Sequence, residues 1–222
     1  VRHEQEISDV SISDVVAVSL LELPIDRERV HGELDVGPRG KLHAHAGSTL
    51  SRRPHGRGVF LLEDDHLHAA RRVVLLGGLG STAIAEYAAY MGNFLGDNWM
   101  PAGRMGASVG AALSDLDRRD ALIVFTKPPF ANTSIRAAEF ARARGVYVLV
   151  VTDTHTCPAL RHASARVVVP TESPNFFSSY VATMFFVETL MAMIAQRAGP
   201  TATERIADVE TANRALGEGI GP

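Results

Sequence analysis

Residues 73–87 read VVLLGGLGSTAIAEY, and this stretch decides the fold class. A continuous apolar run is followed by a glycine-rich turn and then by an alanine-rich segment. An apolar run of this length without alternation is typical of a β-strand that is buried on both faces. The stretch therefore predicts a strand over 72–76 that leads through a tight turn into a helix over 81–95.

The same order of strand and helix recurs along the rest of the chain. Further strands are predicted at 121–125, 146–151 and 166–169, and a fifth at 98–101. Further helices are predicted at 105–116, 134–144, 158–162, 176–195 and 203–216. Strands that alternate with helices form a mainly parallel sheet covered on both faces. The predicted fold is a doubly wound α/β domain with a five-stranded sheet.

The first part of the chain differs in composition from the part that carries these elements. Residues 10–23 could form a strand pair or a short helix. Residues 36–58 are rich in Gly, Pro, Arg and His, and we interpret them as loop or poorly ordered chain. We therefore divide the chain into an N-terminal extension, residues 1–60, and a folded domain, residues 61–222.

Composition and charge exclude several classes of protein. The chain has 222 residues, a formal net charge of −3 and 21% charged residues, which argues against a nucleic-acid coat or a membrane-surface protein. The single cysteine, Cys157, cannot form an intramolecular disulfide, and the first ten residues lack the apolar core of a signal peptide. We expect a cytoplasmic protein.

The apolar run over 176–195 is long enough to span a bilayer. Polar residues such as Ser178, Thr183 and Glu188 recur through it, and no positive cluster precedes it. We interpret the run as a buried or subunit-interface helix, and we expect no contact with a membrane.

Two pairs of histidines stand two residues apart, His43 with His45 and His66 with His68. On a strand, residues with this spacing face the same side and could chelate a metal. No cysteine and no carboxylate cluster completes such a site in the sequence. We therefore predict neither a metal nor another cofactor.

The turn after the first strand has the composition of a phosphate site. Gly78 and Gly80 allow a tight turn and close approach of a ligand to the backbone, and Ser81 and Thr82 add hydroxyl groups. The free amides at the start of the following helix favour an anion. The same glycines could instead serve only the turn. A dinucleotide site is a third interpretation, but it requires an acidic residue after the second strand, and Asp97 precedes its candidate strand.

Polar residues also follow the other predicted strands. Thr126, Lys127, Asn132 and Thr133 follow the strand over 121–125, where they could contact a ligand or cap the next helix. In open parallel sheets ligands bind at the carboxyl ends of the strands. Three further polar residues lie after later strands: Asp153, a candidate cap for the helix over 158–162; His155, a candidate base; and Ser173, a candidate cap or ligand contact before the long helix.

Three segments together resemble a known family. They are VVLLGGLGSTAIAEY, DALIVFTKPPFANTSIRAAEFARARGVYVLVVTD and VVVPTESPNFFSSYVATMFFVETLMA. They are similar to the sugar isomerase (SIS) fold, and within it most similar to the sugar-phosphate-sensing domain of RpiR-type bacterial transcription regulators. The resemblance covers about residues 61–217. It implies a five-stranded parallel sheet, homo-oligomers and a bound phosphosugar.

The resemblance also implies which residues hold the ligand. Gly78, Gly80 and Ser81 match the family's Gly-x-Gly-Ser turn. Thr126 matches the first Ser of its Ser-x-Ser-Gly-x-Thr loop, and Thr133 matches the Thr. Between them the chain departs from the family pattern, because Pro-Pro-Phe at 128–130 stands where Ser-Gly is expected. The departure implies a changed phosphate pose, with a larger or less tightly bound ligand.

The resemblance leaves two functions open. A sensor binds the phosphosugar without changing it, whereas a sugar-phosphate (aldose–ketose) isomerase needs a base in the pocket. Glu172, His155 and His162 are the candidate bases, and none lies in a sequence context that demands catalysis. We therefore interpret the chain as a sensor, with the isomerase as the alternative.

The regulators of this family carry an N-terminal helix-turn-helix, and residues 1–60 do not resemble one. The basic stretch over 39–57 lacks a recognition helix. We expect DNA binding only through a domain that is not evident in this chain. The expected partners are a phosphosugar or a related small molecule and further copies of the chain, as a homodimer or homotetramer.

Overall fold

A computed structural model describes residues 33–36, 42–45, 64–104, 106–174 and 176–218. The chain divides into two compact units, Val1–Leu62 and Glu63–Pro222. The second unit carries all of the elements that the alternating pattern predicts, and the two units are described separately below.

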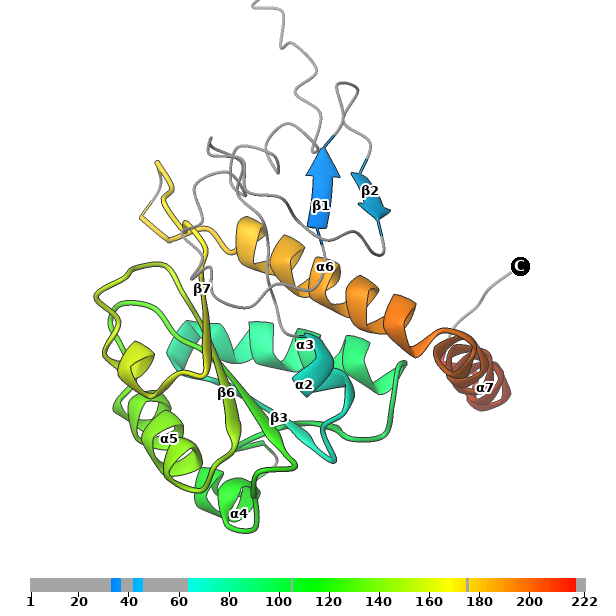
Figure 1. The fold of residues 1–222 in the computed structure, drawn as a ribbon, viewed down its shortest axis with the longest axis horizontal. Coiled ribbons are helices and arrows are strands. Elements are labelled where there is room, and N and C mark those ends of the chain that lie inside the picture. Colours follow the sequence, from blue (N-terminus) through cyan, green and yellow to red (C-terminus); the bar gives the residue numbers. More distant parts are fainter. Residues whose placement is uncertain (1–32, 37–41, 46–63, 105, 175, 219–222) are drawn as a thin grey trace, which may run out of the picture. The chain divides into compact units, whose positions relative to one another are not determined.

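A five-stranded parallel sheet forms the centre of the second unit, in the order β4-β3-β5-β6-β7 (Figure 1). The strands are β3 (Val73–Gly77), β4 (Trp99–Pro101), β5 (Ala121–Phe125), β6 (Tyr147–Thr152) and β7 (Ala165–Val168). Every residue of β5 is buried, as expected for a strand covered on both faces. The predicted fold class is confirmed, and so is the short strand at residues 99–101.

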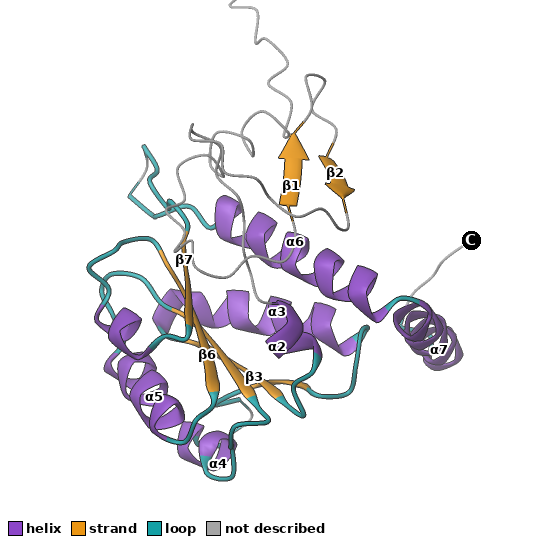
Figure 2. Ribbon diagram, viewed as in Figure 1, coloured by secondary structure: helices purple, strands orange, loops and turns teal. Residues whose placement is uncertain are grey.

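Helices cover both faces of this sheet (Figure 2). They are α2 (Asp64–His68), η1 (Leu79–Ser81), α3 (Thr82–Asn93), α4 (Val109–Leu113), α5 (Asn132–Ala143), η2 (Pro158–His162), α6 (Val181–Ala198) and α7 (Pro200–Leu216), where η denotes a 3-10 helix. α4, α5 and η2 share one hydrophobic core with alternate strand residues such as Val74, Leu122 and Val148. α3, α2 and α6 pack together over the other face.

Two predicted helices begin several residues later in the structure than the sequence suggested. The helix predicted over 105–116 is reduced to α4, because Gly103 and Gly106 adopt positive φ angles and Ser108 caps the helix with its side chain. The long helix begins at Val181, five residues later than predicted. Phe176 and Phe177 lie before it in an exposed loop, at 94% and 78% exposure.

Within the described part of the chain, α6 is the one helix with the length and mean hydropathy (1.2) of a membrane-crossing segment. Its buried residues include Phe186, Val187, Leu190 and Ile194. This side of the helix packs against α3 and α2. α6 therefore has a packing partner along one face, and 33% of its residues are buried, so the structure shows a partly buried helix and does not test the subunit-interface alternative.

The first unit contains one described element, an antiparallel pair of strands. β1 (Glu33–Val36) pairs with β2 (Leu42–His45), with Val36 opposite Leu42. The prediction of loop over 36–58 is therefore wrong at β2. Apolar residues alternate with polar ones in both strands, and Gly-Pro-Arg-Gly lies between them, which is a hairpin pattern that the richness in Gly and Arg concealed. The prediction for residues 10–23 lies outside the described residues.

Candidate functional site

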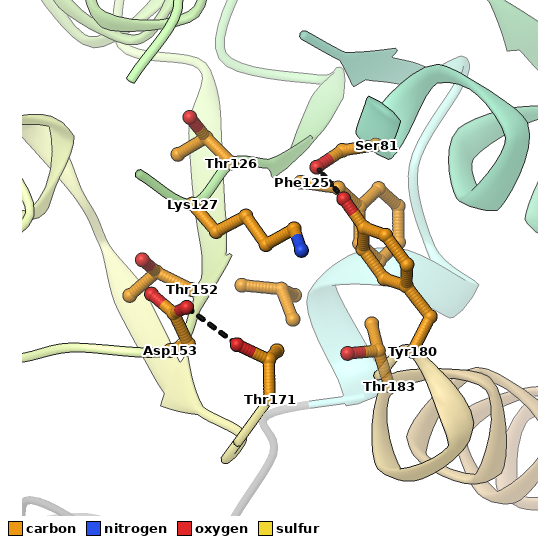
Figure 3. Close-up of a pocket in the computed structure, with 10 residues that line it drawn as sticks. Ser81, Phe125, Thr126, Lys127, Thr152, Asp153, Thr171, Tyr180 and Thr183 are labelled. Atoms are coloured by element: carbon orange, nitrogen blue, oxygen red, sulfur yellow. Dashed lines mark hydrogen bonds between the residues drawn. The ribbon is translucent and has the colours of Figure 1, made fainter. Parts of the chain in front are cut away.

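A pocket lies at the carboxyl ends of the parallel strands, where ligands of open α/β sheets bind (Figure 3). Its empty space is about 220 Å³, open mouth included. The lining residues come from the turn after β3, the ends of β5 and β6, the segment after β7 and the start of α6: Ser81, Phe125, Thr126, Lys127, Val151, Thr152, Asp153, Thr171, Tyr180 and Thr183.

The glycine turn contributes one hydroxyl to this pocket. Ser81 is buried, and its Oγ lies 3.0 Å from Tyr180 Oη. Gly78 approaches α5 so closely that an added Cβ would lie 2.5 Å from Ala131 Cβ and 2.7 Å from Ser134 Oγ. A glycine is therefore required at position 78 for packing, whatever the pocket holds.

Several polar groups of this turn are already bonded within the fold. The Gly78 amide donates to the Phe125 carbonyl at 3.4 Å, and the Ser81 amide donates to the Gly78 carbonyl at 3.0 Å. The Thr82 hydroxyl bonds to the carbonyls of Gly77 and Leu79. The turn therefore offers a ligand fewer backbone amides than the sequence pattern suggested, and Thr82 is not among the lining residues.

Lys127 supplies the positive charge of the pocket. Its Nζ lies 4.2 Å from the centre of the Tyr180 ring, a cation–π contact, and Figure 3 shows its side chain extended across the pocket toward that ring. Tyr180 in turn contacts Ser81. Lys127, Tyr180 and Ser81 thus connect β5, the segment before α6 and the glycine turn at one side of the pocket.

Three buried oxygen atoms that belong to lining residues lack a hydrogen-bond partner within the described residues. They are Oγ1 of Thr126, Oγ1 of Thr152 and Oδ1 of Asp153. Both threonines are at most 4% exposed. They lie side by side because Phe125 pairs with Val151 in the β5–β6 register. All three atoms are themselves covered, and Figure 3 shows the Thr126 and Thr152 hydroxyls turned away from the space that the Lys127 side chain crosses.

The second oxygen of Asp153 has a partner. Thr171 Oγ1 donates to Asp153 Oδ2 at 2.6 Å. The prediction that Asp153 caps the helix at 158–162 is wrong, since Cys157 occupies the cap position of η2. Asp153 instead faces the pocket, held by the segment that follows β7.

The structure brings together some of the predicted ligand residues and separates others from the pocket. Ser81, Thr126 and Lys127 line it. Gly78 and Gly80 shape the turn beside it without lining it. Asn132 and Thr133 are exposed in the first turn of α5, and neither is its cap, because the cap position is Ala131. Ser173 is not a lining residue. It lies eight residues before α6, which is too far away to cap that helix.

The candidate bases also lie outside the pocket. Glu172 and His155 are exposed, and His162 accepts a hydrogen bond from its neighbour Arg161 at 3.0 Å. Within the described residues, no group of three His, Cys, Asp or Glu side chains could hold a metal ion. Lys127, Asp153 and Tyr180 are therefore the ionisable groups among the lining residues.

Sequence reasoning missed five of the eight polar lining residues. Thr152, Asp153, Thr171, Tyr180 and Thr183 were not among the candidate ligand contacts. A signal existed for Thr152 and Asp153, because Thr126-Lys127 and Thr152-Asp153 both follow a buried apolar strand and must lie at the same sheet edge. No comparable signal existed for Tyr180, whose position depends on where α6 begins.

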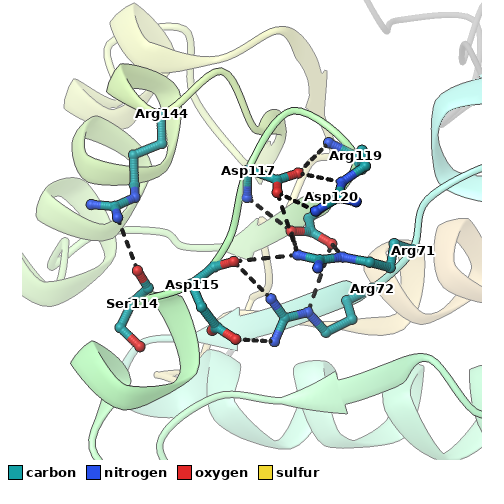
Figure 4. A network of polar contacts seen from close by, with 8 residues as sticks. All are labelled: Arg71, Arg72, Ser114, Asp115, Asp117, Arg119, Asp120 and Arg144. Carbon is teal, nitrogen blue, oxygen red and sulfur yellow. Dashed lines mark hydrogen bonds and ion pairs between the residues drawn. The ribbon is translucent and has the colours of Figure 1, made fainter.

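A second polar cluster lies at the opposite edge of the sheet, before β3 and β5 (Figure 4). Arg71 binds both oxygens of the fully buried Asp120 carboxylate, at 3.0 and 2.7 Å. Arg72 contacts Asp115 at 3.0 Å, and Arg119 contacts Asp117 at 2.7 Å. Burial alone would raise the pKa of Asp120, but the hydrogen bonds from Arg71 and from the Asp117 amide outweigh it and hold that pKa below its ordinary value. We name these six residues the ionic cluster.

The SIS domain family matches residues 66–193, which is more than half of the chain. The chain therefore belongs to the SIS domain family. No curated protein matches the chain in sequence.

Solved structures support the fold assignment. The sugar isomerase domain of an RpiR transcription factor from Sphaerobacter thermophilus is 24% identical, with a TM-score of 0.62 over 67% of this chain and 83% of that one. The NanR protein of Vibrio vulnificus, complexed with ManNAc-6P, is 16% identical, with a TM-score of 0.59 over 69% of this chain and 59% of that one. A Methanococcus jannaschii protein with an inferred function of 3-hexulose-6-phosphate isomerase is 13% identical, with a TM-score of 0.52 over 65% of this chain and 80% of that one.

Proposed function

We propose that residues 63–222 bind a phosphorylated sugar and serve as the effector-sensing domain of an RpiR-type transcription regulator. The observation that supports this most is the Lys127 ammonium in a pocket at the carboxyl ends of the strands whose lining includes the side chains of Thr126, Thr152 and Asp153. A sugar ring offers hydroxyl groups to the polar side chains that line the pocket, and a phosphate offers negative charge to Lys127. The structural relative complexed with ManNAc-6P supports the same class of ligand.

The pocket favours a sensor over an isomerase. Moving a proton between neighbouring carbons needs a positioned base, for which His and Glu are common choices. The lining residues include neither His nor Glu. Of the ionisable groups that they do include, Asp153 is bound by Thr171, and Lys127 lies against the Tyr180 ring. The sequence candidates Glu172 and His155 are exposed outside the pocket. Bound phosphosugars are therefore expected to leave this protein unchanged.

A thermal-shift panel of phosphosugars tests the proposal. A ligand at a hundred times its Kd stabilises the fold by about 2.7 kcal/mol, which gives a readily measured rise in melting temperature. Lys127→Met and Thr152→Val should each reduce that rise. Arg118→Met, which removes an exposed positive charge outside the pocket, is the control and should not. If no phosphosugar raises the melting temperature, the proposal fails. Turnover of a bound phosphosugar, followed by NMR, would instead establish the isomerase.

The regulatory part of the proposal concerns partners. We expect DNA to be contacted by a domain other than residues 63–222, and the protein to be a cytoplasmic homodimer or homotetramer. Sedimentation velocity with and without the phosphosugar measures the assembly. Specific binding of operator-length DNA by residues 63–222 alone would contradict this assignment.

A further inference from the structure

The last helix of the domain contributes little to its core. α7 spans 17 residues, Pro200–Leu216, and Ala202 is its one buried residue. It packs against α6, which lies across the view in Figure 1, whereas α7 is seen almost end-on, so the two helices diverge after Gly199. Leu216, at the end of α7, is 74% exposed. Because helices in proteins are stabilised mainly by packing of an amphipathic face, α7 calls for a further packing partner.

The sequence of α7 follows the heptad spacing of a coiled coil. Four of its residues are spaced by three, four and three positions: Ile206, Val209, Asn213 and Leu216. Residues with this spacing lie along one side of a helix, and they occupy a, d, a and d positions in turn. Ala202 continues the d row one turn earlier. The first three of the four are partly exposed, and Leu216 is exposed. We name these four residues the α7 seam.

Opposite charges flank the α7 seam. Arg205 occupies the g position before it, and Glu210 occupies the e position of the next heptad. In a parallel pair of helices, this g residue of one helix lies opposite this e residue of the other, and such residues form ion pairs across the seam. Two-fold symmetry makes the pair occur twice. Within its own helix, Glu210 contacts Arg214 at 3.4 Å with both side chains more than half exposed, which leaves its carboxylate accessible to a second helix.

We infer that α7 binds the α7 of a second copy of this chain as a short, parallel, two-stranded coiled coil. Asn213 favours the parallel arrangement, because there the two copies of this side chain meet in one layer and can hydrogen-bond to each other. An antiparallel arrangement would place Asn213 against a d residue, and the d residues of α7 are all apolar. α7 lies beyond residues 66–193, which match the SIS domain family. The inference goes beyond the proposed function, since the pairing of α7 does not depend on what the pocket binds.

Disulfide cross-linking of the full chain tests the pairing. Asn213→Cys places a thiol in the α7 seam, where the two copies of a parallel pair come within the distance of a disulfide. Glu204→Cys places the same thiol on the opposite, exposed side of α7 and is the matched control, and the native Cys157 is buried. We expect Asn213→Cys to form covalent dimers at least about tenfold faster than Glu204→Cys, because paired thiols react at a high effective concentration. Equal rates overturn the inference.

Charge reversal identifies the partner as a second α7. In sedimentation velocity of the full chain, Arg205→Glu and Glu210→Arg should each raise the dissociation constant for self-association about fivefold, because like charges then meet twice across the seam. The double variant restores opposite charges in the reverse order and should return the dissociation constant to about that of the wild type. Glu204→Arg makes the same change of charge outside the seam and should leave it unaltered.

The outcomes separate this inference from the proposed function. If the two single variants self-associate as the wild type does, or if the double variant fails to recover, the inference is overturned. It is also overturned if α7 packs on another segment of its own chain, in which case oxidation of Asn213→Cys yields no dimer. The thermal shift with phosphosugars is measured at the pocket and decides the proposed function independently of these results.

Discussion

Neighbouring glycines of one turn have different tasks in this domain. Gly78 is held against α5, where an added Cβ would lie 2.5 Å from Ala131 Cβ. At Gly80 an added Cβ would lie 3.4 Å from Tyr180 Oη and touch nothing else within 4 Å. A sequence motif treats both glycines as parts of one phosphate turn, whereas the structure separates a packing residue from one that borders the pocket.

Substitution of each glycine by alanine should therefore affect different measurements. Gly78→Ala introduces overpacking and should lower the free energy of unfolding by about 2 kcal/mol, measured by urea denaturation. Gly80→Ala should leave that free energy nearly unchanged and weaken phosphosugar binding, because the new methyl group crowds Tyr180. Equal losses of stability in the two variants would contradict this division of roles.

The ionic cluster makes an acid-sensitive contribution to stability. Asp120 is fully buried and bound to Arg71 by two hydrogen bonds. Asp120→Asn turns an amide N–H₂ group toward N–H donors that the carboxylate accepted from, while the Arg71 charge that it leaves is 41% exposed, so the change should cost about 2 kcal/mol at neutral pH, measured by chemical denaturation. Asp208→Asn, at an exposed position, is the control and should cost less than about 0.5 kcal/mol.

The difference in stability between the wild type and Asp120→Asn depends on pH, in a way that follows from the lowered pKa of Asp120. The pKa of Asp120 is lower in the folded state than the ordinary value of about 4, so its contribution is complete above that value. The contribution is lost as the pH falls through the folded-state pKa. The difference between wild type and Asp120→Asn should therefore shrink below about pH 4. A difference that stays constant down to acid unfolding would show that Asp120 acts through packing alone.

At the scale of elements, strands were predicted better than helix ends. The run at 121–125 coincides with β5, and the other strands shift by one residue at most, because a strand buried on both faces leaves a continuous apolar run in the sequence. Helix ends depend on backbone angles and tertiary contacts that the pattern lacks. The start of α6 is the clearest case: Phe176 and Phe177 read as helix, yet they are exposed in the loop that brings Tyr180 to the pocket.

The same dependence on backbone angles and tertiary contacts explains which pocket residues the sequence could predict. Ser81, Thr126 and Lys127 were predicted because they follow strands directly, and sheet topology alone brings such residues together. Asn132 was predicted from its place after a strand, and Thr133 also from a family loop, but both are exposed in the first turn of α5. Tyr180 and Thr171 enter from segments whose course the sequence pattern does not determine.

One polar contact between helices carries a prediction at this scale. Tyr87 of α3 donates to Glu188 of α6 at 2.9 Å, and this bond raises the pKa of Tyr87 above its ordinary value. Because the pKa of Tyr87 is raised in the folded state, the contribution of this hydrogen bond to stability is complete below about pH 10. It is lost as the pH rises through the folded-state pKa. Tyr87→Phe should cost about 1 kcal/mol at pH 7 by urea denaturation. Tyr90→Phe, at an exposed position of the same helix, should cost less.

At the scale of the whole molecule, binding and stability depend on opposite edges of one sheet. The pocket lies after the strands, and the ionic cluster lies before them. The same parallel topology places both, because each strand enters from one edge and leaves at the other. Changes in the ionic cluster should therefore act on unfolding and changes at Lys127 on binding, with little coupling between distant sites.

The boundary of the folded domain carries the last prediction. The second unit begins at Glu63, just before α2. Leu67 of this short helix is 2% exposed, α2 packs on α6, and the His66 ring stacks on Tyr147 with 4.5 Å between centroids. A chain of residues 63–222 should therefore unfold cooperatively and show the same rise in melting temperature with a phosphosugar as the full chain.

A second truncation shows whether α2 belongs to this domain. A chain of residues 71–222 lacks Leu67 and leaves part of α6 uncovered, so it should be less stable than residues 63–222 by about 3 kcal/mol, in line with the loss of a buried leucine. Urea denaturation of the two chains side by side measures this difference. Equal stability would place the start of the domain at β3 and make α2 an addition to it. Failure of residues 63–222 to fold would show that the sheet needs the preceding segment, in spite of its complete set of strands.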